Sequence, residues 1–535
     1  MPEVFPALHY FTDSWISARP ESIHADVVVY GGTSAGVFAA VAAQRLGRST
    51  LLLHPGKHLG GMTTGGLGWT DYGNKNIIGG MARRFYQDLG RAYGCDEIWS
   101  FEPSVAKDVI KRMMAEAQVP VQFGQYLQSA TMDGRRIAMV TMLGGLRVHG
   151  KVFIDATYEG DLLALAGVSH AVGRESNVAY GETLNGIQVR NLHQFSHPVD
   201  PYVRPGDSSS GLLPWIVGED LSLCQGQGDG RVQAYCFRVC MTDDPALRVD
   251  WPKPPGFNPD EYLLATRWFQ GDKDAYNDQL ARTADGADAV PAKFDILAPR
   301  TAGGFHKTDT NNHGPVSSDF IGANYDWPQG NYVQRERIFQ NHVRYQAGLY
   351  WHITHSPEIP QRYQHAYGLW GLARDEFTDT GLWPHQLYVR EARRMTGDYV
   401  LTEHDCRLTR RCPDAVAMGS YNMDSHNCSR FIKIDVGQVR VLNEGDVQVP
   451  CAGPYGISYR CLVPRTGECE NLLVPVCLSA SHIAYGSVRM EPVFMALGEV
   501  AANAAHCALE EQCAVQAVDF SILQSRLVAA GAVLT

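Results

Sequence analysis

A short glycine-rich segment near the start of the chain has the residue types and spacing that bind a diphosphate. Residues 31–36 read GGTSAG, which is the dinucleotide-binding pattern G-x-G-x-x-G except that Thr33 replaces the second glycine. Gly31 permits a tight turn, and Gly36 permits close packing of a helix on the preceding strand. Backbone N–H groups at the start of such a helix point toward the diphosphate. We expect the whole segment to contact a dinucleotide: Gly31, Gly32, Thr33, Ser34, Ala35 and Gly36.

The segments on either side must hold these glycines in a strand–turn–helix–strand unit. Residues 26–30 form an apolar run typical of a buried parallel strand, residues 37–47 are rich in helix formers, and residues 49–55 form a second apolar strand. His54, followed by Pro55, ends the second strand, where Asp or Glu usually binds the ribose hydroxyls. A neutral imidazole makes one hydrogen bond there, whereas a carboxylate can accept two. The alternative is an ordinary βα turn in another doubly wound sheet.

A second glycine-rich segment indicates which kind of dinucleotide the protein binds, a flavin or a nicotinamide cofactor. Residues 58–74 read HLGGMTTGGLGWTDYGN. A nicotinamide enzyme has no evident need for such a loop, whereas the diphosphate and isoalloxazine of a flavin can both lie against its backbone. The loop therefore favours FAD, and a merely flexible loop is the alternative. The expected cofactor contacts are His54, Pro55, Gly60, Gly61, Met62, Thr63, Thr64, Gly65 and Gly66.

Five later segments strengthen the flavin interpretation. They are IDATYEGDLLALAG from Ile154, GRESNVAYGETLNG from Gly173, DTNNHGPVSSDFIGANYDWP from Asp309, WPHQLYVREARRMTGDYVLTEHD from Trp383 and NLLVPVCLSASHIAYGSVRMEPVFMALGEVAANAA from Asn471. With the two glycine-rich segments, they resemble the FAD-dependent oxidoreductase family of glutathione-reductase-like fold that includes xanthan-lyase-like flavoproteins. The resemblance covers most of residues 25–510 and implies that Thr33 is normal in this family. His54 departs from it, because the family commonly has Glu there.

The resemblance also implies cofactor contacts beyond the first strands. A strand over residues 153–157 should pass close to the cofactor at Thr157. Glu159 and Asp161 should begin a helix, either as capping acids or as cofactor contacts. Near the C-terminus, a buried strand over 471–476, a glycine-containing turn and a helix with Pro492 in its first turn should aim that helix at the flavin. The expected contacts there are Gly486, Arg489 and Met490, with Arg489 pairing either a flavin oxygen or Glu491.

Two histidines and one polar run are the candidates for chemistry on a substrate. His482 lies in the expected turn before the C-terminal helix and is our first candidate for a general base, with His426 second. A histidine that only hydrogen-bonds the turn is the alternative. The run HKTDTNNHG is dense in hydrogen-bonding groups and is either a solvated loop or a site for a hydroxyl-rich, carbohydrate-like substrate. The expected substrate contacts are Asp309, Asn311, Asn312 and His313.

Composition excludes several other classes of protein. The 535-residue chain has 46 basic and 57 acidic residues, a net charge of −11, so a nucleic-acid partner is not expected. No apolar run approaches the ~18 residues of a membrane span, and the N-terminus lacks the features of a secretory signal. Thirteen scattered cysteines indicate free thiols in the cytoplasm. We expect no metal site, a small-molecule substrate, and an oligomeric state that the sequence leaves open.

These observations predict an α/β protein, with a Rossmann-like FAD-binding domain and an inserted α+β substrate or cap domain. Residues 1–175 and 441–535 should form the FAD-binding domain, and residues 176–440 the insert, which should contain a helix from about Tyr332 to His355. The expected activity is FAD-dependent oxidation of a small polar molecule, as a dehydrogenase or oxidase, with hydride transfer to flavin N5. The alternatives are a non-redox flavoenzyme (a lyase or isomerase) and a non-catalytic carbohydrate-binding protein.

Overall fold

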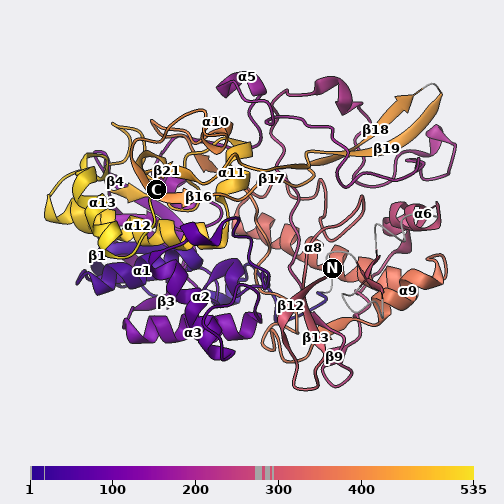
Figure 1. Ribbon diagram of the computed structural model, residues 1–535, viewed down its shortest axis with the longest axis horizontal. Helices are drawn as coiled ribbons and strands as arrows, with labels where there is room; N and C mark the ends of the chain where they lie inside the picture. The colour runs from indigo at the N-terminus through magenta and orange to yellow at the C-terminus, as the bar shows by residue number, and fades with distance from the viewer. Residues whose placement is uncertain (1–2, 17, 272–279, 283–288, 292–293, 436) are drawn as a thin grey trace.

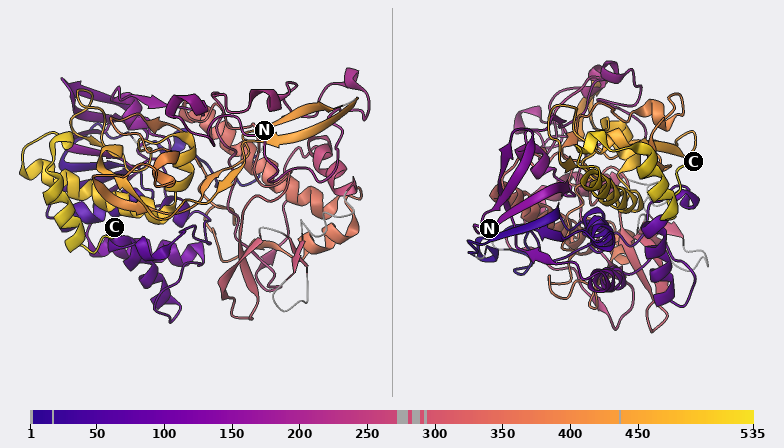
Figure 2. Two further views of the ribbon diagram at one scale, coloured as in Figure 1. Left: turned by 45° about the horizontal axis from the view of Figure 1, so that its top comes forward. Right: turned by 90° about the vertical axis from the view of Figure 1, so that its left-hand side faces the viewer.

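The computed structural model describes residues 3–16, 18–271, 280–282, 289–291, 294–435 and 437–535. The molecule is elongated, with both ends of the chain contributing to the left half in Figure 1 and the middle of the chain forming the right half. Figure 2 shows the same division after rotation. The N-terminus itself crosses over and lies near a long helix of the right half in Figures 1 and 2.

A mixed seven-stranded sheet forms the centre of the left half, in the order β3-β2-β1-β6-β5-β4 with β22 paired to β6. The pairs among β1, β2, β3, β6 and β22 are parallel, and those of β5 with β4 and β6 are antiparallel. The strands are β1 (Ser22–Tyr30), β2 (Thr50–His54), β3 (Val121–Phe123), β4 (Leu127–Asp133), β5 (Arg136–Met142), β6 (Arg147–Asp155) and β22 (Leu472–Leu473). Because β22 pairs with β6, segments from both ends of the chain contribute strands to this sheet.

The predicted strand–turn–helix–strand unit is confirmed. Helix α1 (Ser34–Arg45) connects β1 to β2, and Gly47 after it has φ +76°, the left-handed conformation that ends a helix. Helix α12 (Glu491–Glu510) packs on α1 so closely that a Cβ on Gly498 would lie 2.2 Å from the Ala35 carbonyl oxygen. The outer helices are α2 (Gly80–Ala92), α3 (Pro103–Glu116) and α13 (Phe520–Ala529).

Helix α12 is the only helix in the described part of the chain that is long and apolar enough to cross a membrane. Within it, 83% of the qualifying window is buried inside the protein. Its apolar side chains are therefore already covered by protein, chiefly by α1 and its neighbours.

The insert is built on a five-stranded sheet of order β12-β13-β8-β14-β9, whose pairs are all antiparallel. The strands are β8 (Met241–Thr242), β9 (Arg248–Val249), β12 (Phe294–Arg300), β13 (His306–Thr310) and β14 (Gly371–Ala373). Helices α6 (Leu263–Gly271), α8 (Tyr332–His355) and α9 (Gln361–Gly368) accompany it. The bounds of α8 match the predicted helix, and Asn331 with Gln334 forms a capping box at its start.

The remaining elements are short. They are β7 (His170–Ala171) with β15 (Arg394–Met395), β16 (Ala415–Gly419) with β21 (Tyr455–Ser458), β17 (Met423–Ser425) with β20 (Val447–Val449), β18 (Ser429–Asp435) with β19 (Gln438–Glu444), β10 (Leu280–Arg282) with β11 (Ala289–Pro291), and helices α4 (Asp161–Leu165), α5 (Asn177–Tyr180), α10 (Glu403–Cys406) and α11 (His482–Val488). The predicted boundary between residues 440 and 441 falls inside β19, because the sequence does not show that this hairpin pairs with itself.

Candidate cofactor and catalytic site

A cavity of about 410 Å³ opens where β1, β2 and β6 end. This position agrees with the rule that parallel sheets bind ligands outside the carboxyl ends of their strands. Six residues expected to touch the cofactor line it: Gly31, Gly32, Thr33, His54, Pro55 and Thr157. Ser34, Ala35 and Gly36 lie just behind this wall, in the buried first turn of α1.

The first glycine-rich segment forms a backbone cradle that side chains would fill. Gly31 has φ +101°, and a Cβ there would lie 2.7 Å from the Thr157 nitrogen. A Cβ on Gly36 would lie 1.8 Å from the Gly31 carbonyl oxygen, so both predicted glycine roles are confirmed. Thr33 caps α1: its hydroxyl accepts from the Gly36 N–H at 3.3 Å and donates to the Ala156 carbonyl at 2.7 Å. This cradle, open to the cavity, fits a diphosphate.

His54 is the last residue of β2 and lines the cavity, the place where the sequence puts a ribose contact. Its Nδ1 accepts a hydrogen bond from the Gly32 N–H at 2.9 Å. Burial, followed by the nearby His58, lowers the pKa of His54 to about 4, so the ring is neutral at pH 7. The remaining ring N–H is on Nε2 and can donate one hydrogen bond.

The glycines of the second glycine-rich segment are packed tightly behind the cavity, and His58 is the only residue of the segment that lines it. A Cβ on Gly61 would lie 2.3 Å from the Tyr158 hydroxyl, and one on Gly66 would lie 2.0 Å from the Arg238 carbonyl oxygen. The loop is buried, which rules out the flexible-loop alternative. The expected direct contacts from this loop are therefore corrected: Gly60, Gly61, Met62, Thr63, Thr64, Gly65 and Gly66 support lining residues such as Tyr158 and Gln386.

Glu491, at the start of α12, joins the cofactor segments and was not identified from the sequence. Its carboxylate accepts from the Thr63 hydroxyl and from the Tyr158 hydroxyl, both at 2.7 Å. Tyr158 in turn accepts from the Met62 N–H at 2.9 Å. Burial raises the pKa of Glu491. A carboxylate at a helix N-terminus also complements the helix dipole.

The residues around Glu491 make different contacts from those expected. Arg489 does not pair with Glu491: it donates to the Tyr388 hydroxyl at 2.9 Å and to the Asp424 carboxylate at 3.2 Å. Gly486 lies against the backbone of Asp424, where a Cβ would meet the carbonyl oxygen at 2.3 Å. Met490 is the buried N-cap of α12. Gly486, Arg489 and Met490 are outside the cavity lining, because the intervening helix α11 replaces the expected turn.

Asp161 is corrected from a cofactor contact to an ion-pair centre. It begins α4, as expected, but its carboxylate accepts from Arg335 at 2.6 and 2.8 Å and from Arg393 at 2.8 Å. It does not line the cavity. Glu159 does line it, and burial raises the pKa of this carboxyl to about 7. Of the two acids, Glu159 is the one placed for cofactor contact.

His482 is the first residue of α11 and is enclosed by hydrogen-bond partners. Its Nδ1 lies 2.7 Å from Glu391 and its Nε2 lies 3.1 Å from the Ser425 hydroxyl. Only 1% of the residue is exposed. Burial, followed by the charges of two arginines, lowers the pKa of His482 to about 3. Both ring nitrogens are therefore occupied within the fold, which favours the structural alternative for this residue.

His426 has the arrangement of an oriented base. Its Nδ1 lies 2.7 Å from the Asp319 carboxylate, and the acid nearest to Nε2 is Asp424 at 3.8 Å. Burial, followed by the charge of Arg390, lowers the pKa of His426 to about 4, so the ring is neutral at pH 7. With Nδ1–H donated to Asp319, the lone pair is on Nε2.

Three arginines surround the ring of Tyr388 beside this histidine. Their guanidinium carbons lie 4.5 Å (Arg390), 5.6 Å (Arg489) and 5.8 Å (Arg238) from the ring centroid. Each arginine is also paired with an aspartate, Arg390 with Asp319 at 3.0 Å for example. The Nε atoms of Arg390 and Arg489 are buried without a hydrogen-bond partner in the part of the chain that the structure describes. Buried donors of this kind are normally satisfied in proteins.

The expected substrate residues divide into two groups. Asp309 is corrected to a structural residue, because it is fully buried and forms a two-point ion pair with Arg238 at 2.7 Å. Asn311 is half-buried and accepts from Arg390 at 3.4 Å, which joins it to the network around Tyr388. Asn312 and His313 lie next to His193 instead, at 3.2 Å and at a ring separation of 5.7 Å.

Several lining residues come from segments that the sequence did not connect with a cofactor. They are Pro6, Ala7, His9, Tyr10, Ser14 and Trp15 before β1, and Phe339, Asp379, Thr380, His385, Gln386 and Leu387 from the insert. Only His385, Gln386 and Leu387 fall within a segment that resembles the family. The others have no local signal, because their positions depend on long-range packing.

Solved structures give partial matches to this chain. A flavin-containing monooxygenase from Stenotrophomonas maltophilia is 17% identical, over 31% of this chain and 45% of that one, with a TM-score of 0.20. A 3-ketosteroid-delta4-(5alpha)-dehydrogenase from Rhodococcus jostii is 14% identical, over 28% of this chain and 49% of that one, with a TM-score of 0.19. The chain thus matches less than half the length of either protein. Scores this low add nothing to the argument.

A family model gives the decisive comparison. The model for FAD dependent oxidoreductases matches residues 26–527, which is nearly the whole chain. It agrees with the glycine cradle, the cavity at the strand ends and the mixed sheet built from both chain ends. The glutathione-reductase-like and xanthan-lyase parts of the resemblance stay predictions. The chain belongs to the FAD-dependent oxidoreductase family, and it is an enzyme whose cofactor is FAD.

Proposed function

We propose that this enzyme oxidises a small polar molecule at an alcohol or amine carbon. When bound, FAD supplies the acceptor for the substrate hydride at N5. The observation that carries the proposal is the Asp319–His426 pair, with Nδ1 held at 2.7 Å and Nε2 3.8 Å from Asp424, the carboxylate that pairs with Arg489. In this proposal His426 takes the proton from the substrate hydroxyl or amine.

His426 is preferred to His482, our first candidate from the sequence, because of their hydrogen bonds. Both nitrogens of His482 are bonded inside the fold, so a proton could reach it only after Ser425 or Glu391 moves. His426 uses one nitrogen to fix its orientation and keeps the other for a ligand. A carboxylate that orients a histidine in this way is a recurring feature of general bases.

The arginines near His426 support chemistry that develops negative charge on oxygen. Arg390 and Arg489 have buried Nε–H groups without a partner in the described residues, and both lie against Tyr388. A substrate oxygen that loses its proton to His426 would be stabilised by such positioned donors. The network is linked to the cofactor cavity through the start of α12. Arg489 lies two residues before Glu491, and Glu491 accepts a hydrogen bond from Tyr158, which lines the cavity.

The substrate class follows from the density of hydrogen-bonding groups. Asn311 reaches Arg390 and would orient a hydroxyl, with Asn312 and His313 further along the same segment. We therefore propose a hydroxyl-bearing, carbohydrate-like molecule. The non-redox alternative, a lyase or isomerase, has no observation in its favour here, and membership of an enzyme family weighs against a non-catalytic carbohydrate-binding protein.

Anaerobic reduction of the bound flavin tests this proposal. Purified enzyme is mixed with sugars, polyols and amines, and loss of the visible flavin spectrum is followed. For a substrate that reduces the flavin, His426→Ala and His426→Gln should both slow reduction by about 10²–10⁴-fold, the usual contribution of a general base. The control is His365→Ala on α9, an exposed histidine outside the site.

The outcomes separate the possible roles. If Gln restores most of the rate, His426 orients the substrate instead of accepting its proton. If product forms while the flavin spectrum never changes, the reaction is not an oxidation by flavin and the proposal is wrong.

A further inference from the structure

The segment before β1, residues 3–16, lies across the cofactor cavity. Six of its residues line that cavity: Pro6, Ala7, His9, Tyr10, Ser14 and Trp15. We infer that this segment, the N-terminal arm, is a strap that closes the FAD site, and that Glu336 of helix α8 holds it in place. The inference rests on FAD as the cofactor, but it does not depend on any substrate.

Glu336 holds the arm through several donors at once. Its Oε2 accepts from the backbone N–H groups of Tyr10 at 2.7 Å and Phe11 at 2.9 Å. Its Oε1 accepts from Gln340 at 2.8 Å and lies 3.0 Å from Nδ1 of His9. Hydrogen bonds to a charged acceptor are stronger than neutral ones. Residues 10 and 11 have no strand or helix partner for these N–H groups, so Glu336 supplies it.

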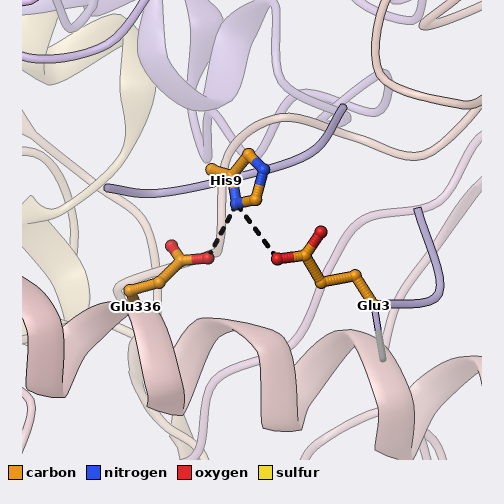
Figure 3. Close-up of side chains that lie close together, drawn as sticks. All are labelled: Glu3, His9 and Glu336. Atoms are coloured by element: carbon orange, nitrogen blue, oxygen red, sulfur yellow. Dashed lines mark hydrogen bonds and ion pairs between the residues drawn. The ribbon is translucent and has the colours of Figure 1, made fainter. Parts of the chain in front are cut away.

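His9 lies between two carboxylates in Figure 3, with Glu336 on one side and Glu3 on the other. The three ligand atoms lie within 4.8 Å of one another, the only such group found in the described residues. The carboxylate of Glu336 already accepts hydrogen bonds from the arm and from Gln340 of α8, and Glu3 is exposed. This geometry fits an ion-paired latch better than a metal site.

Other contacts fix the arm on both sides of the latch. The Gln340 side chain donates to the Leu8 carbonyl at 2.7 Å, and the Tyr126 hydroxyl donates to the Tyr10 carbonyl at 2.8 Å. The Tyr10 ring packs edge-on against Trp327, with ring centroids 4.8 Å apart. These partners belong to both halves of the molecule. The arm therefore connects the FAD-binding domain to the insert across the cavity.

Trp15 gives the arm a surface suited to an aromatic ligand. It lines the cavity together with His54 and Lys57, and the Lys57 ammonium lies 4.2 Å from its ring centroid. His54 marks the end of β2, where folds of this kind hold the adenosine half of a dinucleotide. Aromatic side chains bind flat bases by stacking. Trp15 is thus placed to cover the adenosine half of FAD.

The test is the rate of FAD release from the holoenzyme, measured by the recovery of free-flavin fluorescence after dilution. The strap predicts that Glu336→Ala releases FAD at least tenfold faster than wild type and that Trp15→Ala also releases it faster. The control is Glu358→Ala, an exposed acid just beyond α8 whose side chain makes no hydrogen bond or ion pair with the described residues. Chymotrypsin cleavage after Phe11 is a second measurement, which Glu336→Ala should accelerate and Trp15→Ala should leave unchanged.

The results distinguish this inference from the proposed oxidation. If Glu336→Ala and Trp15→Ala both release FAD at the wild-type rate, the strap is refuted, whatever substrate the enzyme proves to use. Trp15 is only partly buried, so its substitution should leave the fold intact and keeps the test valid if Glu336→Ala is unstable. Failure of every substrate to reduce the flavin would count against the proposed oxidation alone.

Discussion

Replacing Glu159 with glutamine should remove a pH dependence of FAD binding. Glu159 lines the cofactor cavity and is 7% exposed. Burial raises the pKa of its carboxyl from 4.5 to about 7, with Arg335 opposing the rise and Asp161 and Asp155 adding to it. The carboxyl is therefore neutral below pH 7 and becomes charged as the pH rises through 7. A diphosphate bound in the same cavity would then face a carboxylate.

The magnitude follows from the displacement of the pKa. Each unit corresponds to about 1.4 kcal/mol, so the rise from 4.5 to about 7 makes the ionised carboxylate cost the folded protein on the order of 3 kcal/mol. In the unfolded chain the Glu159 carboxyl ionises near its usual pKa of 4.5. Between pH 4.5 and pH 7 the folded protein therefore keeps a proton on Glu159 that the unfolded chain has lost. Stability contributed by the protonated form is present below pH 4.5 and is lost as the pH rises to 7. Glu159→Gln keeps the shape and removes this loss.

The assay is titration of the apoprotein with FAD at pH 6 and pH 9. For wild type we expect the Kd to rise by about tenfold or more, because one pKa unit of coupling between carboxylate and diphosphate is about tenfold. Glu159→Gln should vary by no more than about threefold over the same range. His54, with a pKa of about 4, does not titrate there. Equal pH dependence in the two proteins would refute the reasoning, and Glu358→Gln is the matched control.

Three further substitutions test other parts of the site. His54→Glu should keep FAD affinity or tighten it by about 1 kcal/mol in the same titration, because a carboxylate can accept from both ribose hydroxyls; a large loss would mean that the imidazole N–H itself binds the cofactor. Glu491→Ala should lower the Tm and the FAD content together, because a Tyr158 hydroxyl left without its acceptor costs about 1–3 kcal/mol. His482→Ala should lower the Tm, with a loss of about 1–3 kcal/mol in the free energy of unfolding, because Ser425 and Glu391 lose a buried hydrogen-bond partner. If His482→Ala leaves the Tm unchanged but slows flavin reduction, His482 and not His426 is the general base.

Local patterns predicted the first glycine-rich turn and the end of β2, because each of these parts is encoded within a few residues. The cradle from Gly31 to Gly36 needs only its own glycines and the strand before it, and His54 follows directly from the end of β2. Helix α8 was predicted with its observed bounds because its capping and composition are local.

The rest of the site depends on packing between distant segments. Glu491 contacts Thr63 and Tyr158, which are more than 300 residues away in the sequence. Asp309 forms an ion pair with Arg238, and the spacing of the two residues in the sequence does not predict this pair. The N-terminal arm reaches its latch across a similar separation. Compartment and partners stay predictions from composition.

The flavin content of the purified protein tests the central claim most directly. Cofactor released by acid and separated on a column should be FAD, in a ratio of about one per chain. Gly36→Ala should lose it, because its Cβ would lie 1.8 Å from the Gly31 carbonyl oxygen, whereas Gly368→Ala, with open space around the added Cβ, should retain it. FMN alone, no flavin even after reconstitution, or full FAD content in Gly36→Ala would contradict the assignment of this cavity as the FAD site.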